Sequence, residues 1–158
     1  MAWSYVYLLS SLPMLHIGAK PPFSFERFLA LCHSQAPEAD FAVLEAVGRG
    51  AWESALAEPL IRRWVDFDTA LRNELVRGRG ARLGVEPSLY LRGEAAYPGA
   101  WVAHGVQAAL RHPSPLEGER MLDEMRWHFL EEEAAGRYFD LDRLMVYALE
   151  LMILLRWE

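Results

Sequence analysis

The chain has 158 residues, which suits one domain with a substantial core, and 53% of them are hydrophobic while 24% are charged. This composition excludes a disordered tail and a low-complexity array. The 16 basic and 22 acidic residues give a net charge of −6, which argues against a general nucleic-acid-binding protein. All basic residues except Lys20 are arginine, and the chain carries six tryptophans. Composition alone therefore names no function.

The single cysteine, Cys32, excludes an intrachain disulfide and a zinc site built from several cysteines. Residues 1–4 lack the basic stretch that opens a secretory signal. The apolar stretches 144–149 and 151–155 are separated by Glu150, and together they fall short of the roughly 20 apolar residues that cross a bilayer. These observations predict a soluble, cytoplasmic protein without a transmembrane segment.

The first elements in chain order are short. Residues 5–15 are apolar and fit either a buried strand or a short helix, because periodicity cannot decide so brief a run. Ser24 is placed to cap a helix whose apolar face comprises Phe25, Phe28, Leu29 and Cys32. Pro37 suits the first turn of a second helix, which we expect Gly48 and Gly50 to end.

The middle of the chain is dominated by one amphipathic stretch. Residues 51–77 favour a helix with a break or a kink at Pro59, and beyond the proline an apolar residue recurs every three or four positions, at Leu60, Trp64, Phe67, Leu71 and Leu75. The glycine-rich residues 77–84 predict a loop, and residues 87–97 show little pattern. A further helix is expected from Pro98 to Leu110.

The C-terminal third has the clearest signals. Residues 114–117 (SPLE) combine an N-cap serine, a proline at the first helical position and a glutamate at N3, which predicts a helix that continues to Gly136. Asp140 is placed to cap a last helix through Leu155, which is apolar on several sides and should be central or clamped by a partner. We therefore expect an all-α fold, a single helical domain over 1–158 with about six helices.

Catalytic and metal signatures are weak. His128 has Glu124, Glu131 and Glu132 within reach along one helix, but the spacing does not match the paired motifs of di-iron bundles, and a solvated acidic face explains it better. We find no phosphate loop, dinucleotide fingerprint or nucleophile elbow. The sequence thus predicts a protein that is not an enzyme, with no catalytic residue, no metal and no cofactor.

Five residues are candidate partner contacts. Arg77, Arg79 and Arg82 could grip a phosphate or an acidic partner, although a solvated loop is the more common explanation of such a cluster. Trp127 lies off the core stripe of its helix and Trp157 at the end of the last one. Large aromatic residues in such places are enriched at interfaces, but ordinary packing explains them equally well.

Two groups of motifs carry a family resemblance. The N-terminal group is YVYLLSSLPML at 5–15, KPPFS at 20–24 and FLALC at 28–32. The C-terminal group is WHFLEE at 127–132, YFDLD at 138–142, YALEL at 147–151 and RW at 156–157. Together they resemble a bacterial family of unknown function whose members are typically encoded among the genes for V-type (V/A-type) ATPase subunits. A weaker similarity is to the all-helical C (or d) subunit, which is much longer and has three helical lobes.

The resemblance implies a non-catalytic accessory or structural subunit of a rotary, ion-transporting ATPase, with C/d-like coupling of stalk to rotor as its finer form. The implied partners are stalk or rotor subunits, with no nucleic acid, and the implied location is cytoplasmic and peripheral to the membrane through the complex. The resemblance assigns no functional residue, no particular subunit and no oligomeric state. The alternative is a small helical adaptor or ligand-binding module unrelated to the ATPase. An enzyme comes third, because it would need a deep pocket that gathers His104 or His128 with carboxylates.

Overall fold

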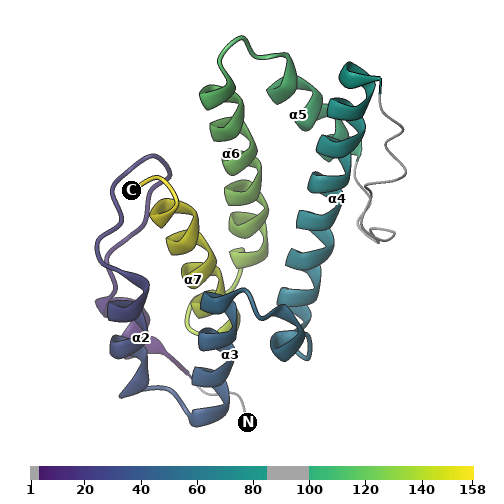
Figure 1. Cartoon of the computed structure of the whole chain (residues 1–158). Coiled ribbons are helices and arrows are strands. Elements are labelled where there is room, and N and C mark those ends of the chain that lie inside the picture. The colour runs from purple at the N-terminus through teal and green to yellow at the C-terminus, as the bar shows by residue number, and fades with distance from the viewer. Residues whose placement is uncertain (1–3, 85–99) are drawn as a thin grey trace. The chain divides into compact units, whose positions relative to one another are not determined.

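The computed structural model describes residues 4–84 and 100–158, which form helices and no strand, so the expected all-α class is confirmed (Figure 1). The elements follow each other as α1 (Val6–Ser11), α2 (Phe25–His33), α3 (Glu38–Arg49), the 3-10 helix η1 (Trp52–Ala55), α4 (Pro59–Leu83), α5 (Ala100–Arg111), α6 (Pro115–Ala134) and α7 (Leu141–Leu155). The apolar run at 5–15 thus contains a short helix. The patternless stretch 87–97 and the helix start expected at Pro98 lie outside the described residues.

The chain divides into two compact units. Unit 1 comprises the residues up to Glu58 together with Trp127–Glu158, and unit 2 comprises the described residues of Pro59–Arg126. The division falls inside α6, between Arg126 and Trp127. A single domain over 1–158 stays a prediction, and each unit is described by itself below.

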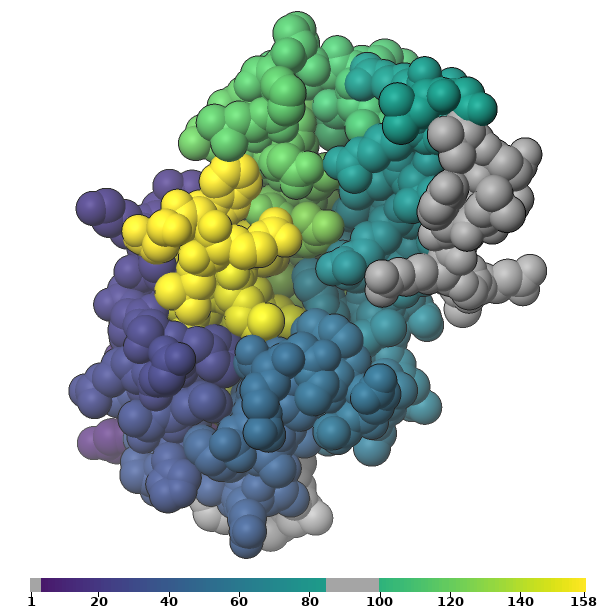
Figure 2. Space-filling view, viewed as in Figure 1, coloured from purple at the N-terminus to yellow at the C-terminus, as the bar shows by residue number. Residues whose placement is uncertain are grey.

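Unit 1 is built around α7. Ten of the fifteen residues of this helix are buried, and α2 and α3 pack against it, so the expectation of a central last helix is confirmed. The ring of Phe28 stacks on that of Tyr147 with centroids 5.6 Å apart. Figure 2 shows the yellow atoms of the C-terminal segment against the dark purple atoms of the N-terminal one. Residues far apart in the sequence therefore share one core.

Side-chain caps set three of the helix starts. The Oγ of Ser24 accepts a hydrogen bond from the amide of Arg27 at 3.1 Å, and Oδ1 of Asp140 accepts one from the amide of Arg143 at 2.9 Å. At the start of α6, the amide of Glu117 donates to the Oγ of Ser114 at 3.3 Å. Each bond satisfies an amide that has no partner within the helix. The three predicted caps are confirmed.

The end of α3 differs from expectation. Gly48 does not end the helix, which continues to Arg49. This glycine instead makes room for a neighbouring side chain, that of Phe25. A Cβ at Gly48 would lie 2.2 Å from Cε1 of Phe25, so the missing side chain makes room for that ring. Gly50 does end the helix, with a φ of 67° in the left-handed region that glycine adopts without a steric penalty.

In unit 2, α4 packs against α5. The predicted stripe of α4 from Leu60 to Leu75 is buried, and Phe67 stacks on Trp101 with centroids 5.5 Å apart. The loop predicted at 77–84 is wrong, because α4 runs through to Leu83. A Cβ at Gly78 would lie 2.3 Å from Cδ1 of Leu110, so glycine here permits close helix packing and does not mark a break.

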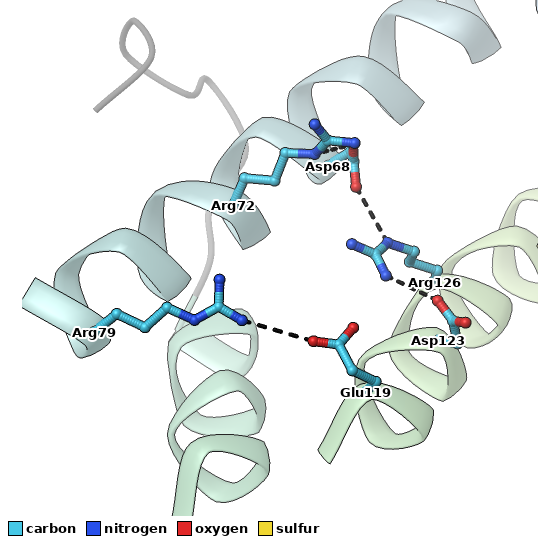
Figure 3. A network of polar contacts seen from close by, with 6 residues as sticks. All are labelled: Asp68, Arg72, Arg79, Glu119, Asp123 and Arg126. Carbon is cyan, nitrogen blue, oxygen red and sulfur yellow. Dashed lines mark hydrogen bonds and ion pairs between the residues drawn. The ribbon is translucent and has the colours of Figure 1, made fainter. Parts of the chain in front are cut away.

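A polar network joins α4 to α6 within unit 2 (Figure 3). Arg126 lies between two carboxylates, with its Nε 3.2 Å from Oδ1 of Asp68 and its Nη1 2.8 Å from Oδ1 of Asp123. Arg72 also pairs with Asp68, at 2.8 Å. The guanidinium of Arg126 is buried, so this network neutralises charges that have left water.

The packing of α6 on α5 makes Gly118 a sensitive position. A Cβ there would lie 2.7 Å from the backbone carbonyl oxygen of Ala109, which can move only with its helix. We expect Gly118→Ala to lower the free energy of unfolding by about 2 kcal/mol, because this overpacking outweighs the better helix propensity of alanine. Urea denaturation followed by circular dichroism measures the change.

Gly105→Ala is the matched control in α5. A Cβ there would lie 2.7 Å from Cε of Met125, at the far end of a flexible side chain that can turn aside. We expect this control to stay within about 1 kcal/mol of the wild type. Equal losses in the two variants would contradict the prediction.

Candidate functional site

Unit 1 contains a cavity of about 620 Å³, within the range of small-molecule sites in proteins. Its walls come from α1, the following residues 12–17, α6, the turn before α7, and α7 itself. Aliphatic side chains cover the N-terminal wall, namely those of Leu9, Leu12, Met14, Leu15 and Ile17. The C-terminal part of the chain contributes aromatic rings to the lining, namely those of Trp127, Tyr138, Phe139 and Tyr147. The cavity is therefore suited to hold an apolar body.

Charged groups line the same cavity. Arg143 and Glu150 are two helical turns apart on one face of α7, and Glu131 is contributed by α6. The side chain of Glu150 is 2% exposed and that of Arg143 is 29% exposed. Nη1 of Arg143 lies 3.6 Å from Oε1 of Glu150, which is too long for a hydrogen bond. Within the described ranges, Nη1 of Arg143 and Oε2 of Glu150 are buried without a hydrogen-bond partner.

The protonation of Glu150 is unusual. Burial, and then the neighbouring carboxyl of Glu131, raise the pKa of the Glu150 carboxyl to about 9, whereas the guanidinium of Arg143 opposes the rise. At neutral pH the group is therefore protonated and can donate a hydrogen bond. If a new positive charge comes close, the same group can ionise and accept one.

Hydrogen bonds tie the N-terminal wall of the cavity to the C-terminal part of the chain. The hydroxyl of Tyr147 donates to the carbonyl oxygen of Pro13 at 2.7 Å, and the amide of Tyr5 donates to the carbonyl oxygen of Phe139 at 2.7 Å. The hydroxyl of Tyr5 also donates to the carboxylate of Asp40 in α3. The first two of these bonds join segments that are more than 130 residues apart in the sequence.

Several large apolar side chains at the cavity are exposed. Met14, Ile17, Tyr138 and Phe139 line the cavity and are also open to solvent, and we call these four residues the apolar rim. Tyr7 on α1 is exposed as well, but it does not line the cavity. Clustered exposed hydrophobic side chains are typical of binding sites.

The three arginines predicted as partner contacts lie on α4 and have partners within unit 2. Nη1 of Arg77 lies 2.6 Å from Oε1 of Glu74, and Nη2 of Arg82 donates to the carbonyl oxygen of Leu110 at 2.6 Å. Arg79 and Glu119 form a looser pair at 3.6 Å between exposed side chains (Figure 3). All three guanidinium groups thus have partners within unit 2, and a role in partner binding stays a prediction.

The two predicted tryptophans differ in their surroundings. Trp127 is buried and lines the cavity, whereas Trp157 is partly exposed beyond the end of α7. Trp127 is thus the one residue of the five candidate contacts that the structure places at the cavity. A role in partner binding stays a prediction for both tryptophans.

The histidine site considered from sequence lies elsewhere. Nε2 of His128 is 3.3 Å from Oε1 of Glu132, and both side chains are exposed. Neither His104 nor His128 is among the described residues that line the cavity. In residues 4–84 and 100–158, no group of three or more histidine, cysteine or acidic side chains is arranged to hold a metal ion. None of the helices described there is long and apolar enough to span a membrane.

Sequence reasoning missed Arg143, Glu150 and most of residues 12–17. One signal was present: Glu150 interrupts the apolar run of a helix that the pattern predicts to be central. A carboxyl in such a place must be buried with compensation or serve a ligand. Its neighbours could not be found in this way, because they come from other elements.

Comparison with known proteins adds one finding. The family model described as a protein of unknown function (DUF2764) matches residues 106–158, about a third of the chain. The matched region includes α6, α7 and the second half of α5. No curated protein and no solved structure matches the chain. The C-terminal region, which supplies Glu131, Arg143 and Glu150, is therefore similar to a family whose function is unknown.

Proposed function

We propose that this chain is a non-catalytic accessory or structural subunit that docks on a stalk or rotor subunit of a V-type (V/A-type) rotary ATPase. One observation carries the proposal. The N-terminal and the C-terminal group of motifs that resemble the ATPase-associated family both lie in unit 1. The N-terminal group supplies Pro13, which accepts the bond from Tyr147 of the C-terminal group. Phe28 and Tyr147, again one from each group, stack on each other.

The apolar rim is the docking surface in this proposal. Three of its four residues, Met14, Tyr138 and Phe139, belong to the resembling motifs, and the fourth, Ile17, follows the first motif closely. Buried positions in a motif can be explained by packing, whereas exposed aromatic and Met side chains are better explained by a partner. Tyr138 and Phe139 also lie within the region that the family model matches. A more specific version of the proposal is a C/d-like role, in which the docked chain couples the stalk to the rotor.

The test is copurification from a host that expresses the complete ATPase. We expect the tagged wild-type chain to recover stalk or rotor subunits, and Met14→Asp combined with Tyr138→Asp to reduce the recovery at least tenfold. Two charges in a desolvated contact cost several kcal/mol, which is enough for such a loss. Circular dichroism confirms that the exposed substitutions leave the fold intact.

Leu56→Asp is the matched control, because Leu56 is exposed in unit 1 but lies outside the apolar rim and outside the resembling motifs. This variant should recover the ATPase subunits as the wild type does, and the purified chain alone should hydrolyse no ATP. The docking proposal is rejected if the wild-type chain recovers no ATPase subunit. An equal loss in the control would reject the apolar rim as the docking surface.

A further inference from the structure

The cavity of unit 1 contains a polar group that the protein itself leaves unsatisfied. Oε2 of Glu150 is buried without a hydrogen-bond partner among the described residues, while Oε1 lies 3.6 Å from Nη1 of Arg143 and the carboxyl of Glu131 is a close neighbour. An unsatisfied buried carboxyl costs free energy that an apolar leucine would not. A ligand with hydrogen-bond donors would satisfy this group.

The charges around the cavity favour a positive ligand. The titratable side chains that line it with Glu150 are Arg143 and Tyr147 from α7, Glu131 from α6, Tyr138 before α7 and His16 from residues 12–17. When both carboxyls are ionised, two negative charges face the single guanidinium, and one added cation completes the balance. A carboxylate ligand would pair with Arg143 but would place a further negative charge beside Glu131.

The aromatic and aliphatic side chains of the lining favour an organic cation over a metal ion. Rings of Trp127, Tyr138, Phe139 and Tyr147 line the cavity, and aromatic faces attract ammonium groups. A volume of about 620 Å³ is far larger than a metal ion needs, and no three histidine, cysteine or acidic side chains of the described residues are grouped to hold one. An apolar body can rest on the aliphatic wall while its charged end meets the carboxyls.

We propose that this cavity binds a small organic amine, with the ammonium group between the carboxyls of Glu131 and Glu150 and the apolar body against the aliphatic wall. The ammonium meets the exposed Glu131 first and reaches the buried Glu150 after a side-chain shift, because Oε2 has almost no accessible surface. Glu150 gives its proton to the solvent as the cation arrives, and the amine keeps its own. This inference does not depend on docking to an ATPase.

The test compares three ligands that share one carbon chain: hexylamine, hexan-1-ol and hexanoate. Isothermal titration calorimetry at pH 7, in two buffers of different ionisation heat, measures affinity and proton release. We expect hexylamine to bind at least tenfold more tightly than the other two, with release of close to one proton. Its affinity should rise several-fold per pH unit from 7 toward 9, where an alkylamine is still protonated.

Two variants show whether Glu150 is responsible. Glu150→Gln should lose at least tenfold in hexylamine affinity and should abolish the proton release. Glu132→Gln, an exposed position on α6 outside the cavity lining, should bind as the wild type does. Both substitutions preserve side-chain volume, and the first is expected to stabilise the fold, so a loss of binding cannot be explained by unfolding.

Several results would overturn the proposal. Tighter binding of hexanoate, with affinity falling as the pH rises, would identify an anion site at Arg143. Equal affinities for the three ligands would show a purely apolar cavity, and the absence of hexylamine binding would exclude the amine. Tighter binding of a capped lysine amide than of hexylamine would identify the cation as a side chain of a partner protein.

Discussion

Glu150→Gln is expected to stabilise the protein at neutral and alkaline pH, by about 3 kcal/mol at pH 7. The pKa of the Glu150 carboxyl is raised from an ordinary value of 4.5 to about 9 in the folded protein, chiefly by burial. Between these two pKa values the folded chain keeps a proton that the unfolded chain releases. The free energy of unfolding therefore falls as the pH rises through this window, by up to about 1.4 kcal/mol per unit.

Glutamine reproduces the protonated carboxyl in shape and can donate a hydrogen bond, but it does not titrate. The variant and the wild type should be equally stable near pH 4, and their difference should grow steadily up to about pH 9. Urea denaturation at pH 4, 5, 6, 7 and 8 measures this difference. Other groups that titrate in unit 1, such as Glu58, whose pKa is also raised by burial, contribute equally to both proteins and cancel.

Glu132→Gln again serves as the control, because the Glu132 carboxylate is exposed beside His128 on α6. We expect its difference from the wild type to stay below about 1 kcal/mol at every pH. If Glu150→Gln showed the same pH dependence of stability as the wild type, Glu150 would be ionised in the folded protein. The proton release predicted for amine binding would then be absent as well.

Arg126→Met is expected to destabilise the protein by about 3–5 kcal/mol. The Arg126 side chain is 8% exposed and contacts Asp68 and Asp123, and the Asp123 side chain is 2% exposed (Figure 3). Methionine keeps most of the aliphatic volume but removes the positive charge, so the buried Asp123 carboxylate loses its neighbouring guanidinium. Removing one partner of a buried pair costs far more than the pair contributes, because the other charge stays out of water.

Arg72→Met is the matched control, because it removes a guanidinium that contacts the same Asp68 at 2.8 Å from a side chain that is 57% exposed. We expect this substitution to cost less than about 1 kcal/mol, since the Arg72 side chain is largely exposed and Asp68 keeps its contact with Arg126. Chemical denaturation of both variants at pH 7 makes the comparison. Losses of the same size would show that burial of Arg126 has no energetic consequence, contrary to the prediction.

The candidate site could be predicted from the sequence only in small part. Of the five candidate contacts, Trp127 lines the cavity, while Arg77, Arg79 and Arg82 pair with neighbours in unit 2. Glu150 was visible as a single charge in an apolar run, but its chemistry comes from Glu131, which lies on another helix. No local pattern indicates that these two carboxyls are neighbours, because side-chain spacing reports contacts only within one helix.

The sequence by itself determined the starts of α2, α6 and α7 and the apolar stripe of α4. Caps such as Ser24 and Asp140 bond to amides three residues away, and the stripe from Leu60 to Leu75 follows the helical period, so both are local properties of the chain. The same locality explains why the 77–84 stretch was mispredicted, since Gly78 serves a contact with Leu110 on α5.

The chain is rich in arginine and tryptophan, and only the tertiary structure shows which of these residues lie at the cavity. Folding brings residues 12–17 against α7 and places an unsatisfied Glu150 beside Arg143 and Glu131. Which helix faces meet depends on the packing of all the helices in the unit. This packing determines how deeply Glu150 is buried, how far its pKa is raised and whether the cavity forms. The cavity proposed to bind an amine is therefore a property of the tertiary structure and not of any single sequence segment.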